Sequence, residues 1–449
     1  MLKKAHYNFY LVLSILLLVG LSAIVELGLS KYHNYIYPEK AEMTSREIEP
    51  GWDKSLSIRA IKIFIPDWQE EILDQERIIR ISPQEPNKVI NAYLKTAEIY
   101  EKVKKYEQAK EACHKILENY PADPMRKNAY LKLASIYEKE KNFARTREMN
   151  ELIIQEFPDD SEAVKVELSN IAIYEKEGKY KEAIDGYKKF LAKYPKTTER
   201  DSLAFKIGLL YRKLGQTDKA DEFYQGITWD KDTVWGDNAR GEIWLATGKG
   251  ESKKKVIYAL KVPVPPKIDG YLNEPVWEKA DKVADFTDSY KNTPKTQKTT
   301  ASLVYDANNL YIAFNCLESN ISGLAAKSTE HDKNVWSDDC IEVFMDTKRD
   351  YTNYFQLIVN PRGTTYDGDK LDLSWEPKWQ AATAIGENHW NVEMAIGFKE
   401  LGAPAPKAGD VWGLNLTRAR RAGETEISNW SFTEGNHHRP EKFGYLIFK

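Results

Sequence analysis

The chain has few of the residues on which metal and redox chemistry most often depend. Only three cysteines, at positions 113, 316 and 340, occur among 449 residues, which is too few for a disulfide framework or a four-thiolate zinc site. An excess of one charge is also missing, because 65 Lys and Arg against 68 Asp and Glu leave a net charge of −3. A nucleic-acid binder carries a strong positive excess. We therefore expect neither thiol-based chemistry nor a nucleic-acid partner.

Apolar residues, by contrast, are plentiful. Hydrophobic residues make up 42% and aromatic residues 12% of the chain, so it can bury substantial cores and is not disordered throughout. A chain of this length exceeds what one compact core holds. We predict a multidomain protein.

The N-terminus contains one long uncharged stretch, Tyr7 to Val25, preceded by Lys3 and Lys4. As a helix it would reach roughly 28 Å, nearly the thickness of a bilayer, and the basic residues in front favour a cytoplasmic N-terminus. We interpret residues 1–30 as a single-pass membrane anchor, with a cleaved signal peptide as the alternative. Both place the soluble part outside the cytoplasm, in the periplasm or at the cell surface, after a linker with an irregular helix at 31–85.

The middle of the chain, residues 86–250, repeats with a period of 37 residues. Four series share this spacing: a tyrosine (Tyr100, Tyr137, Tyr174, Tyr211), an aromatic residue before proline (Tyr120, Phe157, Tyr194), an aromatic residue that opens a helix (Tyr106, Phe143, Tyr180) and a small residue (Ala109, Thr146, Ala183, Ala220). Because proline disfavours the α conformation in the residue before it, each unit reads as two helices that end there.

This pattern resembles tetratricopeptide repeats, in the slightly longer form common in bacterial envelope proteins. The resemblance implies an α-helical solenoid whose concave face docks a protein partner. We interpret the repeated tyrosines as packing between helices, with ligand contact as the alternative. Asp237 to Thr247 is predicted to form a capping helix.

Beyond residue 256 the helical period disappears and short alternating runs take over. They are Ala301–Tyr305, Leu310–Phe314, Ile341–Asp346, Tyr354–Val359, Trp390–Ile396 and Val411–Arg418. Turn sequences such as Asn360-Pro-Arg-Gly363 separate the runs. Such spacing is typical of an antiparallel β-sandwich, which we place at residues 256–449.

Several motifs in this region together resemble the family 9 carbohydrate-binding modules. They are Ile268-Asp-Gly-Tyr-Leu-Asn-Glu-Pro-Val-Trp277, Val304–Phe314, Trp336-Ser-Asp-Asp-Cys-Ile-Glu-Val-Phe-Met-Asp346, Tyr354–Asn360, Gly413–Asn415, Ser428–Ser431 and Pro440–Leu446. The resemblance implies a calcium-containing, DOMON-like jelly-roll sandwich that binds oligo- or polysaccharides and accompanies xylanases.

Sugar binding needs a flat aromatic surface for the apolar face of a pyranose and fixed polar groups for its hydroxyls. The resemblance implies that Trp336 stacks on the sugar, that Glu342 binds hydroxyls and that Gln356 assists. The family's second stacking tryptophan is replaced here by His437. For Trp336 and Glu342 a purely structural role, in the core or in an ion pair, stays open.

The resemblance further implies a structural calcium ion and no organic cofactor. Asp306, Asp339 and Asp346 offer the hard oxygen ligands that calcium prefers. Cys316 and Cys340 allow one disulfide if the strands orient them suitably.

No phosphate loop, metalloprotease pair or nucleophile elbow occurs in the sequence. We therefore predict a non-catalytic, membrane-anchored carbohydrate-binding protein that is linked to carbohydrate catabolism only through its family's association with glycoside hydrolases. Two alternatives remain: an assembly scaffold of the cell envelope, and a haem b electron-transfer domain using Met345 or Met394, as in similar sandwiches of the wider superfamily.

Overall fold

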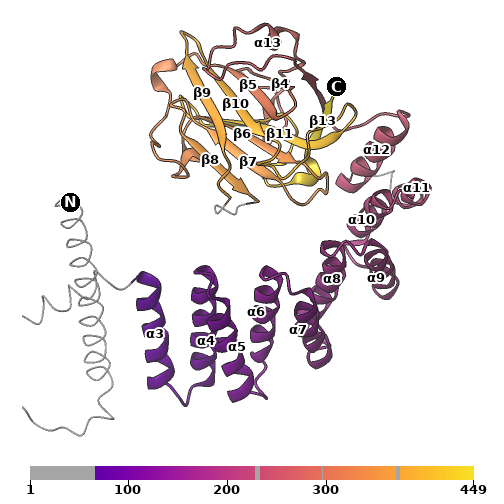
Figure 1. Ribbon diagram of the computed structural model, residues 1–449, viewed down its shortest axis with the longest axis vertical. Helices are drawn as coiled ribbons and strands as arrows, with labels where there is room; N and C mark the ends of the chain where they lie inside the picture. Colours follow the sequence, from indigo (N-terminus) through magenta and orange to yellow (C-terminus); the bar gives the residue numbers. More distant parts are fainter. Residues whose placement is uncertain (1–65, 228–232, 296, 371–374) are drawn as a thin grey trace, which may run out of the picture. The chain divides into compact units, whose positions relative to one another are not determined.

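The computed structural model describes residues 66–227, 233–295, 297–370 and 375–449 (Figure 1). Two compact units divide the chain, one ending at Ala109 and one running from Lys110 to Lys449; each is described by itself. The membrane segment predicted at 7–25 lies outside the described residues. Within them, no helix has both the length and the apolar character that crossing a membrane requires.

The first unit contains helices α3 (Asp67–Ile81) and α4 (Pro86–Lys102). Their aromatic side chains meet, with the ring centroids of Trp68 and Tyr100 6.2 Å apart. The Lys105 ammonium lies 4.4 Å from the centroid of the Trp68 ring, a distance at which a cation is attracted to the face of the ring. The predicted linker therefore ends in a regular helix.

The second unit opens with the helical repeats. Their helices are α5 (Tyr106–Asn119), whose first four residues belong to the first unit, α6 (Arg126–Lys139), α7 (Phe143–Glu156), α8 (Ser161–Lys176), α9 (Tyr180–Lys193), α10 (Arg200–Lys213), α11 (Thr217–Gln225) and α12 (Val234–Thr247). Helices α5, α7 and α9 begin at the predicted aromatic residue and end directly before the aromatic-proline pair, as the restriction that proline imposes requires.

The small residue that recurs with the repeat is at least 99% buried at all four of its positions, Ala109, Thr146, Ala183 and Ala220. A charged pair also recurs with the 37-residue period, since Lys110 pairs with Glu140 at 3.0 Å and Arg147 with Glu177 at 2.5 Å. Each of these cations also lies over a repeated tyrosine, Tyr137 or Tyr174. The period in the sequence therefore reflects packing between helices.

The last repeat helix packs directly on the β-domain. Glu242 of α12 is fully buried and its Oε1 accepts a hydrogen bond from the Tyr351 hydroxyl at 2.6 Å, while Arg349 Nε lies 2.9 Å from the same oxygen. The Tyr351 ring meets Phe205 of α10 edge-on, with centroids 4.9 Å apart. Helices α10 to α12 and the β-domain thus share one core.

The β-domain consists of two layers of strands (Figure 1). One layer has the order β8 (Thr365–Asp369), β7 (Phe355–Val359), β6 (Cys340–Asp346), β11 (Val411–Arg420) and β13 (Gly444–Phe448), with β12 (Glu426–Asn429) beside β11 and β3 (Thr287–Asp288) beside β12. The other has the order β4 (Thr299–Tyr305), β5 (Asn309–Leu317), β10 (His389–Gly397) and β9 (Trp379–Ile385), with β2 (Lys282–Val283) beside β4.

Strand β1 (Val256–Lys261) joins the two layers. Its first residues pair with β13 and its last with β4, and both pairings are parallel. The predicted antiparallel sandwich is confirmed, with the two parallel pairings of β1 as an exception to its antiparallel order. The reason is that β1 arrives from α12 and not from a neighbouring hairpin.

The core between the layers is built by alternate positions along each strand. In β6, Ile341, Val343 and Met345 are fully buried in this core, so the residues between them project from the opposite face. Trp412 and Trp430 belong to the same core, and Trp277 is buried under a smaller cluster beside helix α13 (Pro275–Lys279). All three tryptophans therefore belong to hydrophobic cores.

Candidate functional site

The outer face of β6 and β7 forms the floor of a hollow. Glu342 lies opposite Ile358, and Phe344 lies opposite Gln356. Because side chains alternate along a strand, Glu342, Gln356 and Ile358 share the face turned away from the core. Ala419 of β11 completes this floor, and the hollow measures about 510 Å³.

Trp336 stands on the rim of this hollow, in the short 3₁₀ helix η3 (Val335–Ser337). Asn334 in front of it adopts a left-handed conformation with φ of 55°, which Asn tolerates better than most residues. The indole is 44% exposed and meets the Tyr366 ring edge-on at a centroid distance of 5.4 Å. One flat aromatic face is therefore held in place and open to solvent.

A second part of the rim consists of residues 435–438. The rings of His437 and His438 meet Phe344 edge-on, with centroids 6.2 and 5.7 Å away. His438 Nδ1 lies 2.8 Å from the Tyr354 hydroxyl oxygen. Burial and the neighbouring His438 lower the pKa of His437 to about 4, so this ring is neutral at physiological pH.

Glu342 is the carboxylate of the hollow, and it is only 8% exposed. Gln356 Nε2 donates to its Oε2 at 2.7 Å. Burial raises the pKa of Glu342 to about 7, an effect that Gln356 and the positive charge of Arg421 oppose. Since a carboxylate can accept about four hydrogen bonds, Glu342 retains acceptor capacity toward the hollow.

The structure brings together all four residues expected to bind sugar, namely Trp336, Glu342, Gln356 and His437. Their role in binding stays a prediction. The sequence interpretation missed Arg421, Tyr366 and Asn436, which line the same hollow. Arg421 directly follows β11, but nothing in the sequence pairs that strand with β6 or joins Tyr366 to Trp336.

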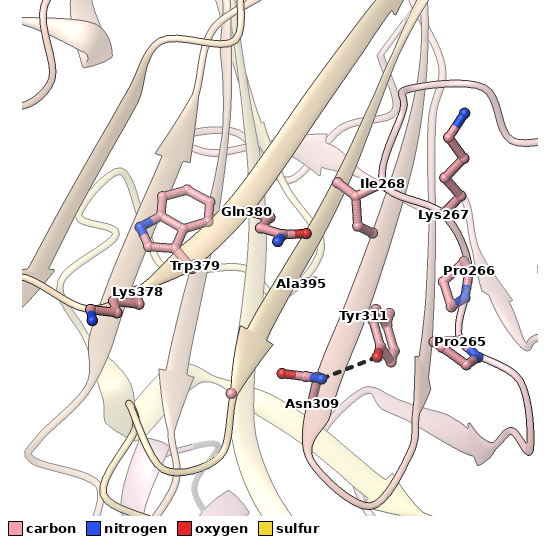
Figure 2. A pocket seen from close by; sticks show the side chains of 11 residues that line it. Pro265, Pro266, Lys267, Ile268, Asn309, Tyr311, Lys378, Trp379, Gln380 and Ala395 are labelled. Atoms are coloured by element: carbon pink, nitrogen blue, oxygen red, sulfur yellow. Dashed lines mark hydrogen bonds between the residues drawn. The ribbon is translucent and has the colours of Figure 1, made fainter.

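A second hollow of about 570 Å³ lies on the other layer, against β5, β9 and β10 (Figure 2). Prolines and lysines line much of it, and Asn309 Nδ2 donates to the Tyr311 hydroxyl at 3.1 Å. Its half-buried Trp379 already donates its indole N–H to Asp367 at 2.8 Å. The residues that line it include no carboxylate, so it does not combine an open indole with an acidic group.

The three aspartates expected to hold calcium do not converge. All six of their oxygens already accept hydrogen bonds, in Asp306 from Asn308, Asn309 and Tyr311, in Asp339 from Ala325 and Arg421, and in Asp346 from Asp350 and Tyr351. Among the described residues, the group of His, Asp and Glu ligand atoms that lies close enough together to hold an ion includes none of these aspartates, so the structure does not gather them into one shared calcium site. A calcium ion held elsewhere stays a prediction without assigned ligands.

The remaining candidate residues are buried. Met345 and Met394 pack in the core between the layers. Cys316 and Cys340 are both free and buried, so the alternative of a disulfide between them is wrong. Burial raises the pKa of both thiols, which makes them poor nucleophiles.

Two sequence families match the chain. Residues 268–449 match the family described as carbohydrate family 9 binding domain-like, and residues 91–123, 171–197 and 201–230 match tetratricopeptide repeats. The helical part of the chain is thus similar to tetratricopeptide repeats, and its β-domain is similar to family 9 carbohydrate-binding domains. The hollow beside Trp336 lies within the segment that matches the carbohydrate family 9 binding domain-like model.

Among curated proteins, the chain is similar to exoglucanase XynX of Acetivibrio thermocellus, at 24% identity over 173 residues. It is also similar to endo-1,4-beta-xylanase A of Thermotoga neapolitana, at 23% identity over 188 residues. These matches cover 38% and 40% of this chain but 15% and 17% of the enzymes. The chain thus spans less than a fifth of the relatives it matches.

Among solved structures, a family 9 carbohydrate-binding module from Caldicellulosiruptor kristjanssonii in complex with cellotriose aligns at 19% identity and a TM-score of 0.35. This match covers 43% of this chain and 94% of that module. A tetratricopeptide repeat protein from Parabacteroides merdae aligns at 14% identity and a TM-score of 0.29, covering 35% of this chain and 60% of that protein.

Proposed function

We propose that this protein binds carbohydrate without cleaving it, and that the sugar occupies the hollow beside Trp336. The observation that carries the proposal is the combination of an exposed indole with a buried carboxylate in one hollow. The apolar face of a pyranose stacks on Trp336. Its hydroxyls donate to Glu342 and accept from the amide and guanidinium groups of Gln356 and Arg421.

Residues 435–438 form the part of the rim that covers a sugar bound in the hollow. His437 is neutral, so it covers the sugar through its ring and not through a charge. An imidazole offers less stacking area than an indole, and we therefore expect weaker binding than a site with two tryptophans would give. The relatives include an exoglucanase and xylanases, which makes β-linked gluco- and xylo-oligosaccharides the first ligands to test.

Trp336→Ala tests this proposal. The full-length protein is screened on a glycan array, and the strongest ligand is then titrated by calorimetry. We expect the variant to bind about 30-fold more weakly, which corresponds to about 2 kcal/mol. Tyr271→Ala is the matched control, because Tyr271 is an aromatic residue that is 60% exposed and lies outside the hollow. Equal affinities of wild type and Trp336→Ala, or silence of both, would refute sugar binding at this site.

We further propose that the helical repeats dock a protein partner, and that residues 7–25 anchor the protein in the cell membrane with its soluble part outside the cytoplasm. The 19 uncharged residues support the anchor. Deleting residues 1–30 is expected to move the protein from the membrane fraction to the soluble fraction. A full-length protein that is already soluble would refute the anchor and leave the sugar site untouched.

The absence of turnover is part of the same proposal. Wild-type protein incubated with its best oligosaccharide ligand is expected to release no new reducing ends. Hydrolysis of a glycosidic bond requires two carboxyl groups that flank the bond about 5–10 Å apart. In that hollow the lining residues include a single carboxylate, Glu342. Release of reducing ends that is lost in Glu342→Gln would overturn this part.

A further inference from the structure

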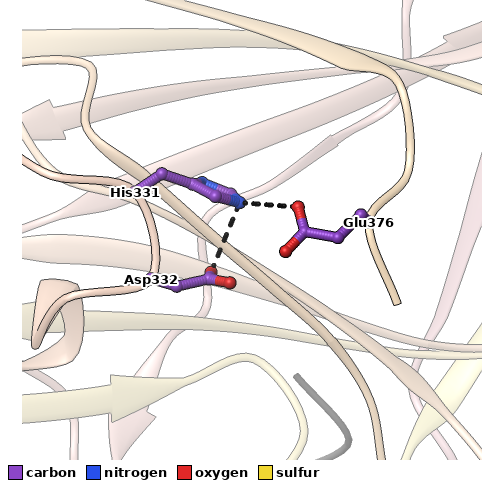
Figure 3. A group of neighbouring side chains, drawn as sticks. All are labelled: His331, Asp332 and Glu376. Carbon is purple, nitrogen blue, oxygen red and sulfur yellow. Dashed lines mark ion pairs between the residues drawn. The ribbon is translucent and has the colours of Figure 1, made fainter. Parts of the chain in front are cut away.

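A second polar cluster lies outside the sugar hollow, at the edge where β8 faces the segment before β9. His331 and Asp332 belong to the loop that leads to Trp336, and Glu376 stands three residues before β9 (Figure 3). His331 Nε2 lies 3.5 Å from Asp332 Oδ1, 3.5 Å from Glu376 Oε2 and 3.4 Å from Asp367 Oδ2. One imidazole nitrogen thus faces three carboxylates.

The other nitrogen of His331 fixes the ring. Its Nδ1 lies 2.9 Å from Thr365 Oγ1, and with the proton on Nδ1 the lone pair of Nε2 points toward the carboxylates. This is the arrangement of a metal-binding histidine, whose second nitrogen is held by a hydrogen bond. The distances of 3.4–3.5 Å are longer than a charge-assisted hydrogen bond of about 2.8 Å.

The same distances suit a shared metal ion. Zinc binds imidazole nitrogen and carboxylate oxygen at about 2.1 Å, and a tetrahedron with such arms has edges of about 3.4 Å. The ligand atoms of His331, Asp332 and Glu376 all lie within 4.8 Å of one another. Glu376 and His331 are 65% and 41% exposed in their side chains, so small rotations can close the remaining gaps.

Asp367 provides an independent observation. Its side chain is 99% buried, and within the described parts of the chain no donor reaches its Oδ1. Its Oδ2 accepts from Trp379 Nε1 at 2.8 Å and faces His331. A buried carboxylate oxygen without a donor is costly, and a cation bound to this carboxylate would offset that cost.

We propose that His331, Asp332, Asp367 and Glu376 bind a divalent transition-metal ion, with zinc as the best match. One imidazole nitrogen among carboxylates favours such an ion over calcium, which takes oxygen ligands. The site is separate from the aspartates expected to hold calcium. The ion would tie the 331–332 loop to β8 and thereby steady the loop that ends in Trp336.

The test is a metal titration of the full-length protein after chelator treatment. Separate calorimetric titrations with Zn²⁺ and Ca²⁺, each followed by thermal unfolding, are expected to give one saturable Zn²⁺ per chain and a raised unfolding midpoint. His331→Gln and Asp367→Asn are expected to weaken Zn²⁺ binding at least about tenfold. His389→Gln is the matched control, because that ring contacts the amide oxygen of Asn388 and not a carboxylate.

His331 lies on an exposed loop, so its variant tests the site even if Asp367→Asn fails to fold. Unchanged Zn²⁺ affinity in His331→Gln, or no saturable Zn²⁺ binding by the wild type, would overturn the proposal. So would Ca²⁺ binding that is as tight as Zn²⁺ binding and is lost in His331→Gln, or Zn²⁺ binding that is lost in His438→Gln instead. None of these outcomes depends on whether the hollow beside Trp336 binds sugar.

Discussion

Two buried glutamates of the β-domain, Glu318 and Glu342, stand in opposite surroundings. Glu318 follows β5, is fully buried and is held by two guanidinium groups, with Arg420 Nε at 2.7 Å and Arg418 Nη2 at 3.2 Å. Although burial favours its neutral form, these arginines hold the pKa of Glu318 below its ordinary value. Glu342 has the amide of Gln356 in place of a cation, and burial raises its pKa to about 7.

The difference separates a structural carboxylate from one that is available to a ligand. The charge of Glu318 is neutralised by Arg418 and Arg420 within the protein. Replacing these donors with a ligand would cost several kcal/mol, since it would leave buried charges unpaired. Glu342 opens on a hollow and retains both acceptor capacity and a tendency to stay protonated. A ligand that donates hydroxyl hydrogens would offset the cost of ionising it.

The largest expected effect is on the Glu318 side of this comparison. Glu318→Ala leaves Arg418 and Arg420 without their carboxylate, and we expect the free energy of unfolding to fall by about 3–5 kcal/mol. Chemical denaturation of the full-length protein measures it.

Glu426 provides the matched control, because it reaches the same Arg420 at 3.6 Å but keeps 19% of its side chain exposed. Glu426→Ala is expected to cost less than about 1 kcal/mol. Similar losses in the two variants would contradict the structural role of Glu318.

The next largest effect is on the free energy of unfolding and its dependence on pH, which the ionisation of Glu342 controls. Because the pKa of Glu342 is raised from 4.5 to about 7, ionisation destabilises the folded state, and the cost grows as pH rises from 4.5 to about 7 and is constant above. Glu342→Gln removes this cost. The variant is expected to match the wild type at pH 4 and to exceed it at pH 8 by at most about 3 kcal/mol.

Denaturation curves of both proteins between pH 4 and 8 measure this difference. Other groups with raised pKa values, such as Asp346, are present in both proteins and cancel in the comparison. If the two free energies of unfolding differ by the same amount at every pH, ionisation of Glu342 does not destabilise the folded state.

The repeats were predictable in detail, and the sandwich was predictable in outline. The 37-residue period reflects identical packing in every unit, so the sequence alone predicts that Ala109 and Ala183 hold equivalent positions, and both are buried. Strands with apolar alternation, such as β6, were equally clear. Strand β8, with the sequence Thr-Tyr-Asp-Gly-Asp, was missed, because its glycine and aspartates are typical of turns.

The candidate site was also predictable only in part. Trp336, Glu342 and Gln356 could be named from the motif that carries them, and two of them face the hollow because of strand alternation. Tyr366 supports the indole from β8, and Asp367 reaches His331 from the next position of that strand. Contacts of this kind depend on which strands are neighbours, and one sequence without its pairing does not contain that information.

A smaller effect concerns ligand binding and its dependence on pH. If hydroxyls donate to ionised Glu342, affinity follows the ionised fraction, which rises about tenfold between pH 6 and 8 for a pKa near 7. His437, with a pKa of about 4, stays neutral over this range. Calorimetry at pH 6, 7 and 8 is expected to show rising affinity in the wild type and a flat profile in Glu342→Gln, whereas a wild type that binds equally at all three would exclude the carboxylate from the contact.

The smallest expected effect tests the single amide that distinguishes the two glutamates. Gln356→Met keeps the size of the side chain but removes the donor that lowers the pKa of Glu342. Losing such a hydrogen bond is worth about 1 kcal/mol, so the midpoint of the affinity profile is expected to move up by less than about one pH unit. Loss of the proposed contact between Gln356 and the sugar would in addition lower affinity by the same factor at every pH, and the two effects therefore separate in one titration series. Gln380→Met, in the hollow of the other layer, is expected to leave the midpoint in place. If both variants leave it in place, Gln356 does not control the charge of Glu342, and the contrast between the two buried glutamates rests on the arginine partners of Glu318 alone.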